Sequence, residues 1–257
     1  MLILGLSLAF LIGISLGLIG SGGSILAVPT LIYVMGIEPR GAIAMSLIIV
    51  GFVSLIGMIP YWRQGKISFR TVAFFTPTAM MGAFLGAQIV RLSWITPTIQ
   101  LVTFGLMMLT ASFFMIRKAS PPKNSSSSSH QNQISPPKNN RVWLIPLEGL
   151  GVGLLTGFVG IGGGFLIIPA LVLVSKIPMK EAVGTSLLMI ALNSVAGFLG
   201  YLGQVNLNWL LLSWFTVFAI AGVLTGSYSS HYVEGEKLQK GFGYFLIAVA
   251  VFILIKR

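Results

Sequence analysis

Long runs without a charged side chain constrain the fold of this chain more than any other feature. Asp, Glu, Lys and Arg are absent from residues 1–35, 41–62, 71–90, 92–116, 149–175, 182–230 and 241–255. About 20 apolar residues suffice for a helix to cross the bilayer core, whereas strands of a membrane barrel would alternate in polarity over about 10 residues. The runs are continuous rather than alternating, so we predict an all-α integral membrane protein.

The composition supports a membrane environment. Of 257 residues, 55% are hydrophobic and only 8% are charged, compared with about 25% charged in an average soluble domain. A soluble fold of this size has too much surface for its volume to bury so much apolar material. The basic residues behind the net charge of +11 lie between the apolar runs. This pattern indicates the lipid bilayer, and not nucleic acid, as the partner.

An internal repeat divides the chain into two copies. A shift of 140 residues aligns the sequence with itself, without a gap, over a stretch of about 70 residues. Matched positions include Gly20/Gly160, Gly22/Gly162, Gly23/Gly163, Pro29/Pro169, Ser46/Ser186 and Ser54/Ser194. Internal repeats are typical of transporter folds, in which the substrate binds where the repeats meet.

A polar segment separates the two copies. Residues 119–141 contain two Pro-Pro pairs and a run of five serines, a composition that cannot bury a core. We therefore predict a first transmembrane repeat at 1–118, a disordered linker at 119–141 and a second transmembrane repeat at 142–257.

Each copy contains four hydrophobic segments, which predicts about eight transmembrane helices. The segments are 2–34, 41–62, 69–90 and 94–116 in the first copy and 142–174, 182–202, 209–229 and 242–255 in the second. An even number of crossings per copy makes the two repeats parallel, related by an axis along the membrane normal.

The distribution of Lys and Arg predicts the orientation in a plasma (inner) membrane. With eight crossings, one side holds ten basic residues: Arg63, Lys66, Arg70, Arg117, Lys118, Lys123, Lys138, Arg141, Lys256 and Arg257. The other holds six: Arg40, Arg91, Lys176, Lys180, Lys237 and Lys240. The positive-inside rule then places both termini and the linker in the cytoplasm.

The first segment of each copy is too long for one straight crossing. About 33 residues would form a helix on the order of 50 Å long, against a hydrocarbon core of about 30 Å. Glycines cluster in the middle, at residues 20–24 and 160–164, and each glycine costs about 1 kcal/mol relative to alanine in a helix. We therefore predict that each first helix is broken at its glycine-rich segment.

A helix break inside a membrane favours anion binding. The unpaired backbone groups require protein or a water-filled cavity to satisfy them, and the N–H groups that start the downstream half-helix attract negative charge. Two such half-helices could hold one small anion between them. The alternative is that these glycines serve helix packing, which we favour for the outer glycines Gly17, Gly82, Gly86, Gly157, Gly222 and Gly226.

The glycine pattern resembles the TauE/SafE sulfite-exporter family. Both copies contain G-x-x-G-x-G-G-x with a proline six residues after the last paired glycine, at Pro29 and Pro169. The second copy is the nearer match, since Ser21 and Ser24 stand where it has Ile161 and Gly164. The resemblance implies a transporter of sulfur-containing anions such as sulfite, sulfoacetate and related organosulfonates.

The predicted substrate site combines the glycine breaks with nearby polar side chains. Its residues are Ser21, Gly22, Gly23, Ser24, Ser46, Ile161, Gly162, Gly163, Gly164, Thr185, Ser186 and Asn193. Each hydroxyl can instead bond to its own helix backbone. The acid nearest to a predicted membrane core is Glu148; it either carries a coupling proton or lies at the interface near Arg141.

Several chemistries are excluded or unsupported. The chain has no cysteine, which removes thiol chemistry, and it has no P-loop for ATP. We expect no catalytic residue, metal or cofactor, and therefore no enzyme.

The function predicted from the sequence is a secondary transporter of a small sulfur-containing oxyanion, coupled to protons or to the membrane potential. The alternative is an accessory or assembly membrane protein, whose interior would be close-packed without a mid-membrane cavity.

Overall fold

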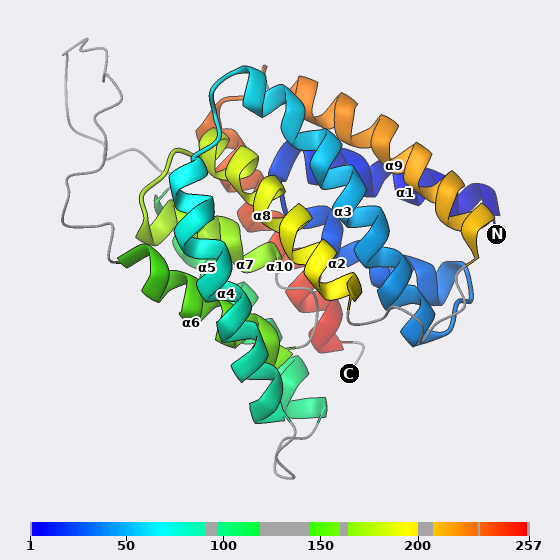
Figure 1. The fold of residues 1–257 in the computed structure, drawn as a ribbon, viewed down its shortest axis with the longest axis horizontal. Helices are drawn as coiled ribbons and strands as arrows, with labels where there is room; N and C mark the ends of the chain where they lie inside the picture. Colours follow the sequence, from blue (N-terminus) through cyan, green and yellow to red (C-terminus); the bar gives the residue numbers. More distant parts are fainter. Residues whose placement is uncertain are drawn as a thin grey trace.

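The computed structural model describes residues 2–90, 97–118, 144–159, 164–199, 208–230 and 232–255, and every regular element in them is a helix. Figure 1 shows the arrangement. The first copy contains α1 (Leu2–Ile19), α2 (Gly22–Pro29), the π-helix η1 (Thr30–Val34), α3 (Pro39–Arg63), α4 (Phe69–Val90) and α5 (Pro97–Lys118). The second contains α6 (Leu144–Val159), α7 (Gly164–Pro169), the π-helix η3 (Ala170–Val174), α8 (Met179–Leu199), α9 (Trp209–Ser229) and α10 (Gly235–Ile255). The predicted linker and the second glycine break lie outside the described residues.

Equivalent helices of the two copies begin at equivalent positions. The shift of 140 residues relates the first residues of η1 and η3, of α3 and α8, and of α4 and α9. In both copies a proline ends the short helix before the π-helix. Proline lacks an N–H and its ring crowds the carbonyl of residue i−4, which favours the wider hydrogen-bonding pattern that follows.

The first helix is broken, and the chain reverses direction at the break. Gly20, between α1 and α2, has φ +83, a conformation that glycine adopts without strain. The start of α1 lies against the residue after η1, because a Cβ on Gly5 would collide with Met35, and Gly23 of α2 lies against Ile12 of α1. Thus α1, α2 and η1 form a helical hairpin that returns to the end where it started.

The second copy forms the same kind of hairpin. The Ser175 hydroxyl, just after η3, donates a hydrogen bond of 2.5 Å to a carboxylate oxygen of Glu148, near the start of α6. The two ends of this hairpin are therefore adjacent, as Gly5 and Met35 are in the first copy. Each copy consequently has five helical passes instead of the four hydrophobic segments expected from the sequence.

The odd number of passes inverts the second copy relative to the first. Helices α3 and α8 run antiparallel, since Gly51 lies against Ser194 while Leu47 lies against Gly197. Helices α5 and α10 also run antiparallel: the Ser112 hydroxyl donates to the Gly243 carbonyl at 2.8 Å, and Gln239 donates to the Met115 carbonyl at 3.0 Å. The prediction of parallel repeats was wrong, because glycine clusters do not reveal whether the chain continues or turns back.

The inversion also separates the linker from the termini. We call the end of the bundle that holds the last residue of α5 and the first residue of α6 the linker side, and the opposite end the terminus side. Because α5 and α10 are antiparallel, α10 ends on the terminus side. Helix α1 runs parallel to α9, as Gly222 contacts Phe10 and Gly226 contacts Ile14, so the chain also begins there, as Figure 1 shows. The prediction that both termini share one side with the linker was wrong.

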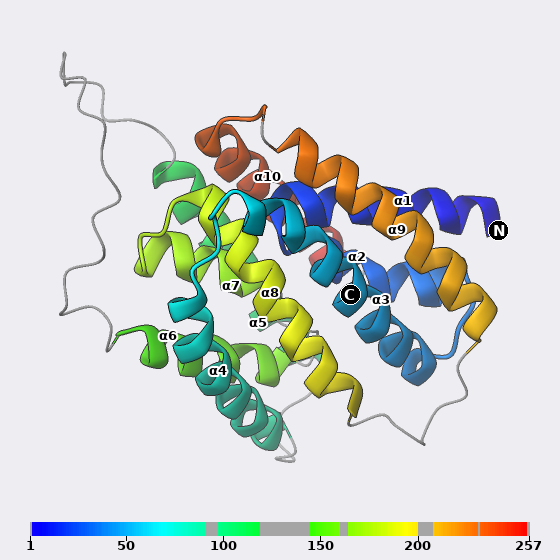
Figure 2. The ribbon, with the colours of Figure 1, turned by 45° about the horizontal axis from the view of Figure 1, so that its top comes forward.

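The copies interlock through glycine faces. Helix α1 packs along α9, and α4 packs along α6, as Figure 2 shows for the first pair. Glycines lie directly against the backbone of the partner helix at Gly17, Gly82, Gly222 and Gly226, which confirms their predicted role in packing. The absence of a Cβ lets the helix backbones approach closely.

One pair of glycines on α6 tests this packing. We expect Gly153→Ala to destabilise the protein by about 1–3 kcal/mol, a typical cost of overpacking, because the new Cβ would collide with the Ala79 carbonyl of α4. Gly151→Ala is the matched control, since its Cβ meets no atom within 4 Å. Unfolding in detergent measures both variants; equal stability would contradict close packing of α4 on α6.

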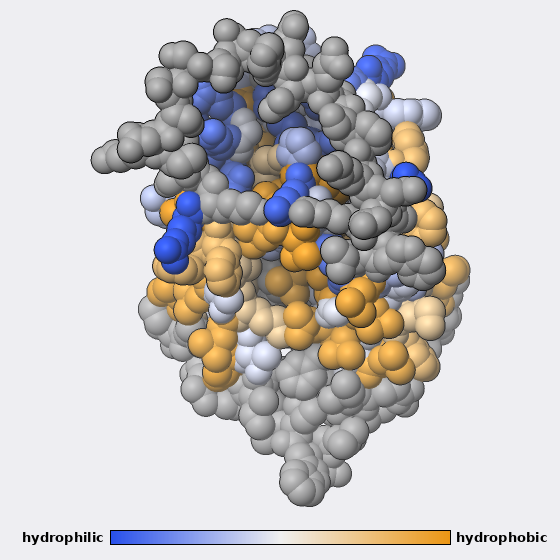
Figure 3. Space-filling model, turned by 90° about the vertical axis from the view of Figure 1, so that its left-hand side faces the viewer, coloured by the Kyte–Doolittle hydropathy of each residue, from blue (hydrophilic) through white to orange (hydrophobic). Residues whose placement is uncertain are grey.

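The outside of the bundle suits a lipid environment. Three described helical spans are long and apolar enough to cross a membrane: Gly41–Arg63, Met179–Leu199 and Trp209–Ser229. Large apolar side chains such as Phe52, Phe114 and Trp214 are exposed. Figure 3 shows a broad hydrophobic zone on one face, with hydrophilic residues gathered above it.

Candidate functional site

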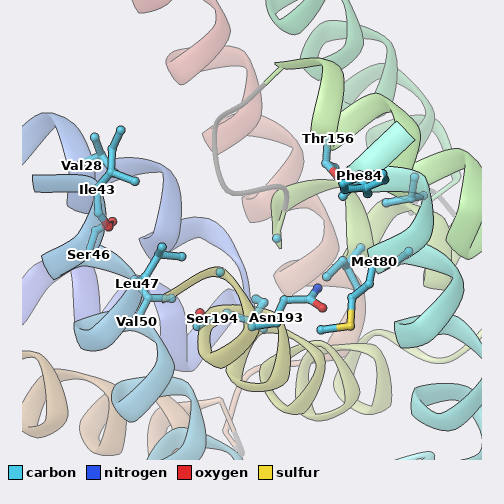
Figure 4. Close-up of a pocket in the computed structure, with 18 residues that line it drawn as sticks. Val28, Ile43, Ser46, Leu47, Val50, Met80, Phe84, Thr156, Asn193 and Ser194 are labelled. Carbon is cyan, nitrogen blue, oxygen red and sulfur yellow. The ribbon is translucent and has the colours of Figure 1, made fainter. Parts of the chain in front are cut away.

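A cavity of about 640 Å³ lies between the two copies. Its walls come from α2, α3 and α4 of the first copy and from α6, α7 and α8 of the second. Figure 4 shows Ser46 and Leu47 on one side, Met80 and Phe84 on the other, and Asn193 between them. The lining residues of α3 lie near its start and those of α4 and α8 near their ends. The cavity therefore occupies the terminus-side half of the bundle.

The polar groups of the cavity are neutral. Among the described residues, its lining includes no Lys, Arg, His, Asp or Glu, and the polar side chains are Ser46, Thr156, Asn193 and Ser194. Ser46 donates to the Ile43 carbonyl at 2.8 Å, and Thr156 to the Gly153 carbonyl at 2.8 Å. The Asn193 side-chain oxygen is buried and has no hydrogen-bond partner in the described part of the chain. A buried amide oxygen without a partner in a cavity wall calls for a hydrogen-bond donor, and the NH2 group of the same side chain can donate to a polar ligand.

Three of the residues predicted from the sequence, counted among those that the structure describes, line this cavity. Ser46 comes from α3, Gly164 is the first residue of α7, and Asn193 comes from α8. Two copies that are far apart in sequence thus contribute to one space, as expected where repeats meet. Ile161, Gly162 and Gly163 lie outside the described residues, and of Ser24 only the helical backbone is described.

The other predicted residues whose side chains or backbone contacts the structure describes lie away from the cavity lining and are closed in by neighbouring helices. Ser21, Thr185 and Ser186 are fully buried. The Ser186 hydroxyl donates to the Val183 carbonyl at 2.9 Å, and the Thr185 hydroxyl accepts from the Ser68 N–H at 3.0 Å. Gly22 and Gly23 of α2 pack against α1, next to Ser15 and Ile12 respectively.

The loop between α3 and α4 closes the linker-side half over these residues. Gly184 of α8 lies under the Lys66 carbonyl and the Tyr61 side chain. The Lys66 ammonium donates to the Gln64 side chain at 2.6 Å. Burial, and secondarily the nearby charge of Lys180, lower the pKa of Lys66. This region is covered by protein, in contrast to the cavity half.

Sequence reasoning missed the apolar walls of the cavity. Val28, Leu47, Met80, Phe84 and Ile190 line it. They sit within continuous apolar runs, so no pattern in the sequence distinguishes a residue that faces a cavity from one that faces lipid or the core.

Comparison with known proteins defines the class. The family described as "Sulfite exporter TauE/SafE" matches residues 5–253. The chain therefore belongs to this family of membrane transporters.

Individual relatives are similar over most of their length. A "Probable membrane transporter protein" of Xylella fastidiosa (strain Temecula1) is 33% identical over 248 residues, which cover 95% of this chain and 91% of the relative. The "Probable membrane transporter protein YdhB" of Bacillus subtilis is 28% identical, covering 85% of this chain and 84% of that protein. No solved structure matches the chain significantly.

Proposed function

We propose that this protein is a secondary transporter that moves a small sulfur-containing anion, which binds in the cavity between the inverted copies. The observation that carries the proposal is the cavity itself, built from both copies and including Ser46, Gly164 and Asn193. Transporters with inverted repeats bind substrate near the midplane at the repeat interface. Family membership supports an anion of sulfur as the cargo.

The lining chemistry suits the oxygens of a sulfonate or sulfite. These oxygens accept hydrogen bonds, and the Ser194 hydroxyl and the Asn193 amide N–H groups can donate them. The Ser46 and Thr156 hydroxyls can do so by turning away from the Ile43 and Gly153 carbonyls of their own helices. The part of the lining that the structure describes contains no carboxylate, so an anion meets no like charge there. Neutral donors replace part of the water that the anion loses, which limits the cost of burying it.

The size and walls of the cavity favour a carbon-bearing anion over bare sulfite. A volume of about 640 Å³ lies within the 300–1,000 Å³ typical of sites for organic ligands. Sulfite, with one sulfur and three oxygens, would leave much of this space unfilled. It would also leave the apolar side chains of Val28, Met80 and Phe84 without contact to the ligand. We therefore place sulfoacetate or a related organosulfonate ahead of sulfite.

The helix directions lead to a new orientation in the membrane. By chain order, the linker-side helix ends and the segments joining them contain twelve basic residues: Arg63, Lys66, Arg70, Arg117, Lys118, Lys123, Lys138, Arg141, Lys176, Lys180, Lys237 and Lys240. The terminus side has four: Arg40, Arg91, Lys256 and Arg257. The positive-inside rule then puts the linker in the cytoplasm and both termini outside a plasma membrane. The cavity would lie in the outer half of the bilayer.

The accessory-protein alternative predicts a close-packed interior. A cavity of about 640 Å³ between the copies does not fit that expectation, although many glycines do serve packing. The cavity supports transport over a purely structural role.

Ligand-dependent stability tests the site. We expect sulfoacetate to raise the Tm of the purified protein, because a ligand that binds only the folded state stabilises it. Sulfite should raise it less, and acetate, which lacks the sulfonate, should leave it unchanged. Asn193→Leu should weaken sulfoacetate binding about tenfold, the equivalent of one hydrogen bond.

The matched control for this variant is Val195→Leu, an exposed position on the same helix, which should keep wild-type binding. Equal sulfoacetate binding by Asn193→Leu would move the site elsewhere. If no sulfur-containing anion shifts the Tm, the proposed cargo is wrong.

A further inference from the structure

The inverted copies are not in the same conformation. Residues that line the cavity have equivalents, 140 positions away, that are packed shut on the linker side. Ala83 and Val152 line the cavity and are partly exposed, and Ser194 lines it at 5% exposed. Their equivalents Val223, Ile12 and Ser54 are 0%, 4% and 0% exposed. One sequence pattern thus forms an accessible space in one half of the molecule and a closed interior in the other.

Ser54 is an exception within this closed interior. Its side chain is fully buried, and its hydroxyl has no hydrogen-bond partner among the described residues. Leaving a buried polar group without a partner destabilises the folded state, so the presence of Ser54 requires an explanation. The equivalent residue, Ser194, lines the cavity. Ser186, the equivalent of the cavity residue Ser46, is also fully buried.

A tyrosine connects the helices that close the linker side. The Tyr61 hydroxyl, near the end of α3, donates to the Gly17 carbonyl of α1 at 2.7 Å and lies 2.7 Å from the Ser230 hydroxyl at the end of α9. Its side chain also lies against Gly184 of α8. Tyr61 is 1% exposed, so it joins the first hairpin to two helices of the second copy without competition from water.

We propose that the linker-side half contains a second substrate-binding chamber, with Ser54 and Ser186 as its polar contacts, and that Tyr61 keeps it closed in this conformation. The proposal rests on the transport function proposed above. Because the copies share a sequence pattern and are inverted, each can adopt the arrangement of the other, which exchanges the open half for the closed one. The unpaired Ser54 hydroxyl then donates to a sulfonate oxygen, in the role of Ser194 on the terminus side. Ser186 donates when its hydroxyl turns from the Val183 carbonyl, as Ser46 does when its hydroxyl turns from the Ile43 carbonyl. Val53 stands where the second copy has Asn193, so this chamber offers hydroxyls without the amide.

Cysteine accessibility tests the exchange, since the chain has no native cysteine. Single-cysteine variants pair a cavity position with its closed equivalent: Ser194→Cys with Ser54→Cys, and Ala83→Cys with Val223→Cys. With Tyr61 intact, a membrane-impermeant methanethiosulfonate should modify the cavity positions from the terminus side and leave the two closed positions unmodified. Adding Tyr61→Phe should speed modification of the closed positions at least tenfold, from the linker side only, and slow modification of the cavity positions.

Ser230→Ala removes the hydroxyl that Tyr61 contacts on α9, so it should also speed modification of the closed positions. This second variant is a control for a folding defect caused by Tyr61→Phe itself. The proposal is overturned if neither variant exposes Ser54→Cys or Val223→Cys, or if all four cysteines become reactive together, which indicates loosening of the whole bundle. The assay uses no substrate. An exchange in accessibility without sulfonate flux would contradict the proposed cargo, whereas flux without an exchange would contradict the second chamber.

Discussion

Ala83→Trp is expected to reduce sulfoacetate uptake into proteoliposomes at least tenfold. Ala83 lies on α4 and lines the cavity opposite the α3 wall. An indole at this position would occupy space in the cavity that the ligand requires. Because the side chain grows into a cavity instead of a packed core, the cost of overpacking, typically about 1–3 kcal/mol, should be small here and the fold retained.

Ala73→Trp provides the control for this prediction. Ala73 is on the same helix but is exposed at the bundle surface, so its replacement adds the same indole outside the cavity. Uptake at the wild-type rate by Ala83→Trp would show that substrate does not pass through this cavity. Equal loss of uptake in both variants would indicate a general effect on α4.

Gly20→Ala is expected to destabilise the protein by roughly 2–5 kcal/mol, the sum of left-handed strain and overpacking. Gly20 has φ +83 at the tip of the first hairpin, and a Cβ there would lie 2.7 Å from the Ser186 hydroxyl and 3.0 Å from the Cα of Val183. The tip is therefore held against α8 of the second copy. Chemical unfolding in detergent measures the loss.

Gly36→Ala separates the cost of left-handed backbone strain from the cost of overpacking. Gly36 has φ +68 but no atom within 4 Å of its would-be Cβ, so this variant carries the strain of about 1–2 kcal/mol alone. Adding Ser186→Ala to Gly20→Ala should recover part of the stability that Gly20→Ala loses beyond Gly36→Ala, because it removes the Ser186 hydroxyl, the atom nearest to the new Cβ. If Gly20→Ala is no less stable than Gly36→Ala, the hairpin tip does not pack on α8 as described.

The sequence predicted the helical class, the repeat and the first break, but not the direction of the chain after a break. Glycine clusters interrupt helices through local propensity, whereas the reversal depends on contacts between residues far apart, such as Met35 with Gly5 and Ser175 with Glu148. Local patterns do not contain that information. The parity of the passes, the inversion of the copies and the positions of the termini all depend on it.

The candidate site was predictable only in part for a related reason. Ser46 and Ser186 are equivalent in sequence, and both were expected to face the substrate. The structure places Ser46 at the cavity and Ser186 in a closed interior, because two copies of one motif adopt different conformations. A sequence repeat reports what the copies share, so it cannot indicate which copy forms the accessible cavity.

The sequence allowed two roles for Glu148, a proton carrier or an interfacial acid. In the structure its carboxylate accepts a hydrogen bond from Ser175 at the base of the second hairpin, away from the cavity lining.

Uptake of radiolabelled sulfoacetate into proteoliposomes tests the central claim most directly. We predict saturable uptake by the wild-type protein, inhibited by excess unlabelled sulfoacetate and more weakly by sulfite, and reduced at least tenfold in Asn193→Leu with Val195→Leu unaffected. Uptake no greater than in protein-free liposomes, or full activity in Asn193→Leu, would contradict transport of this anion through the cavity between the copies.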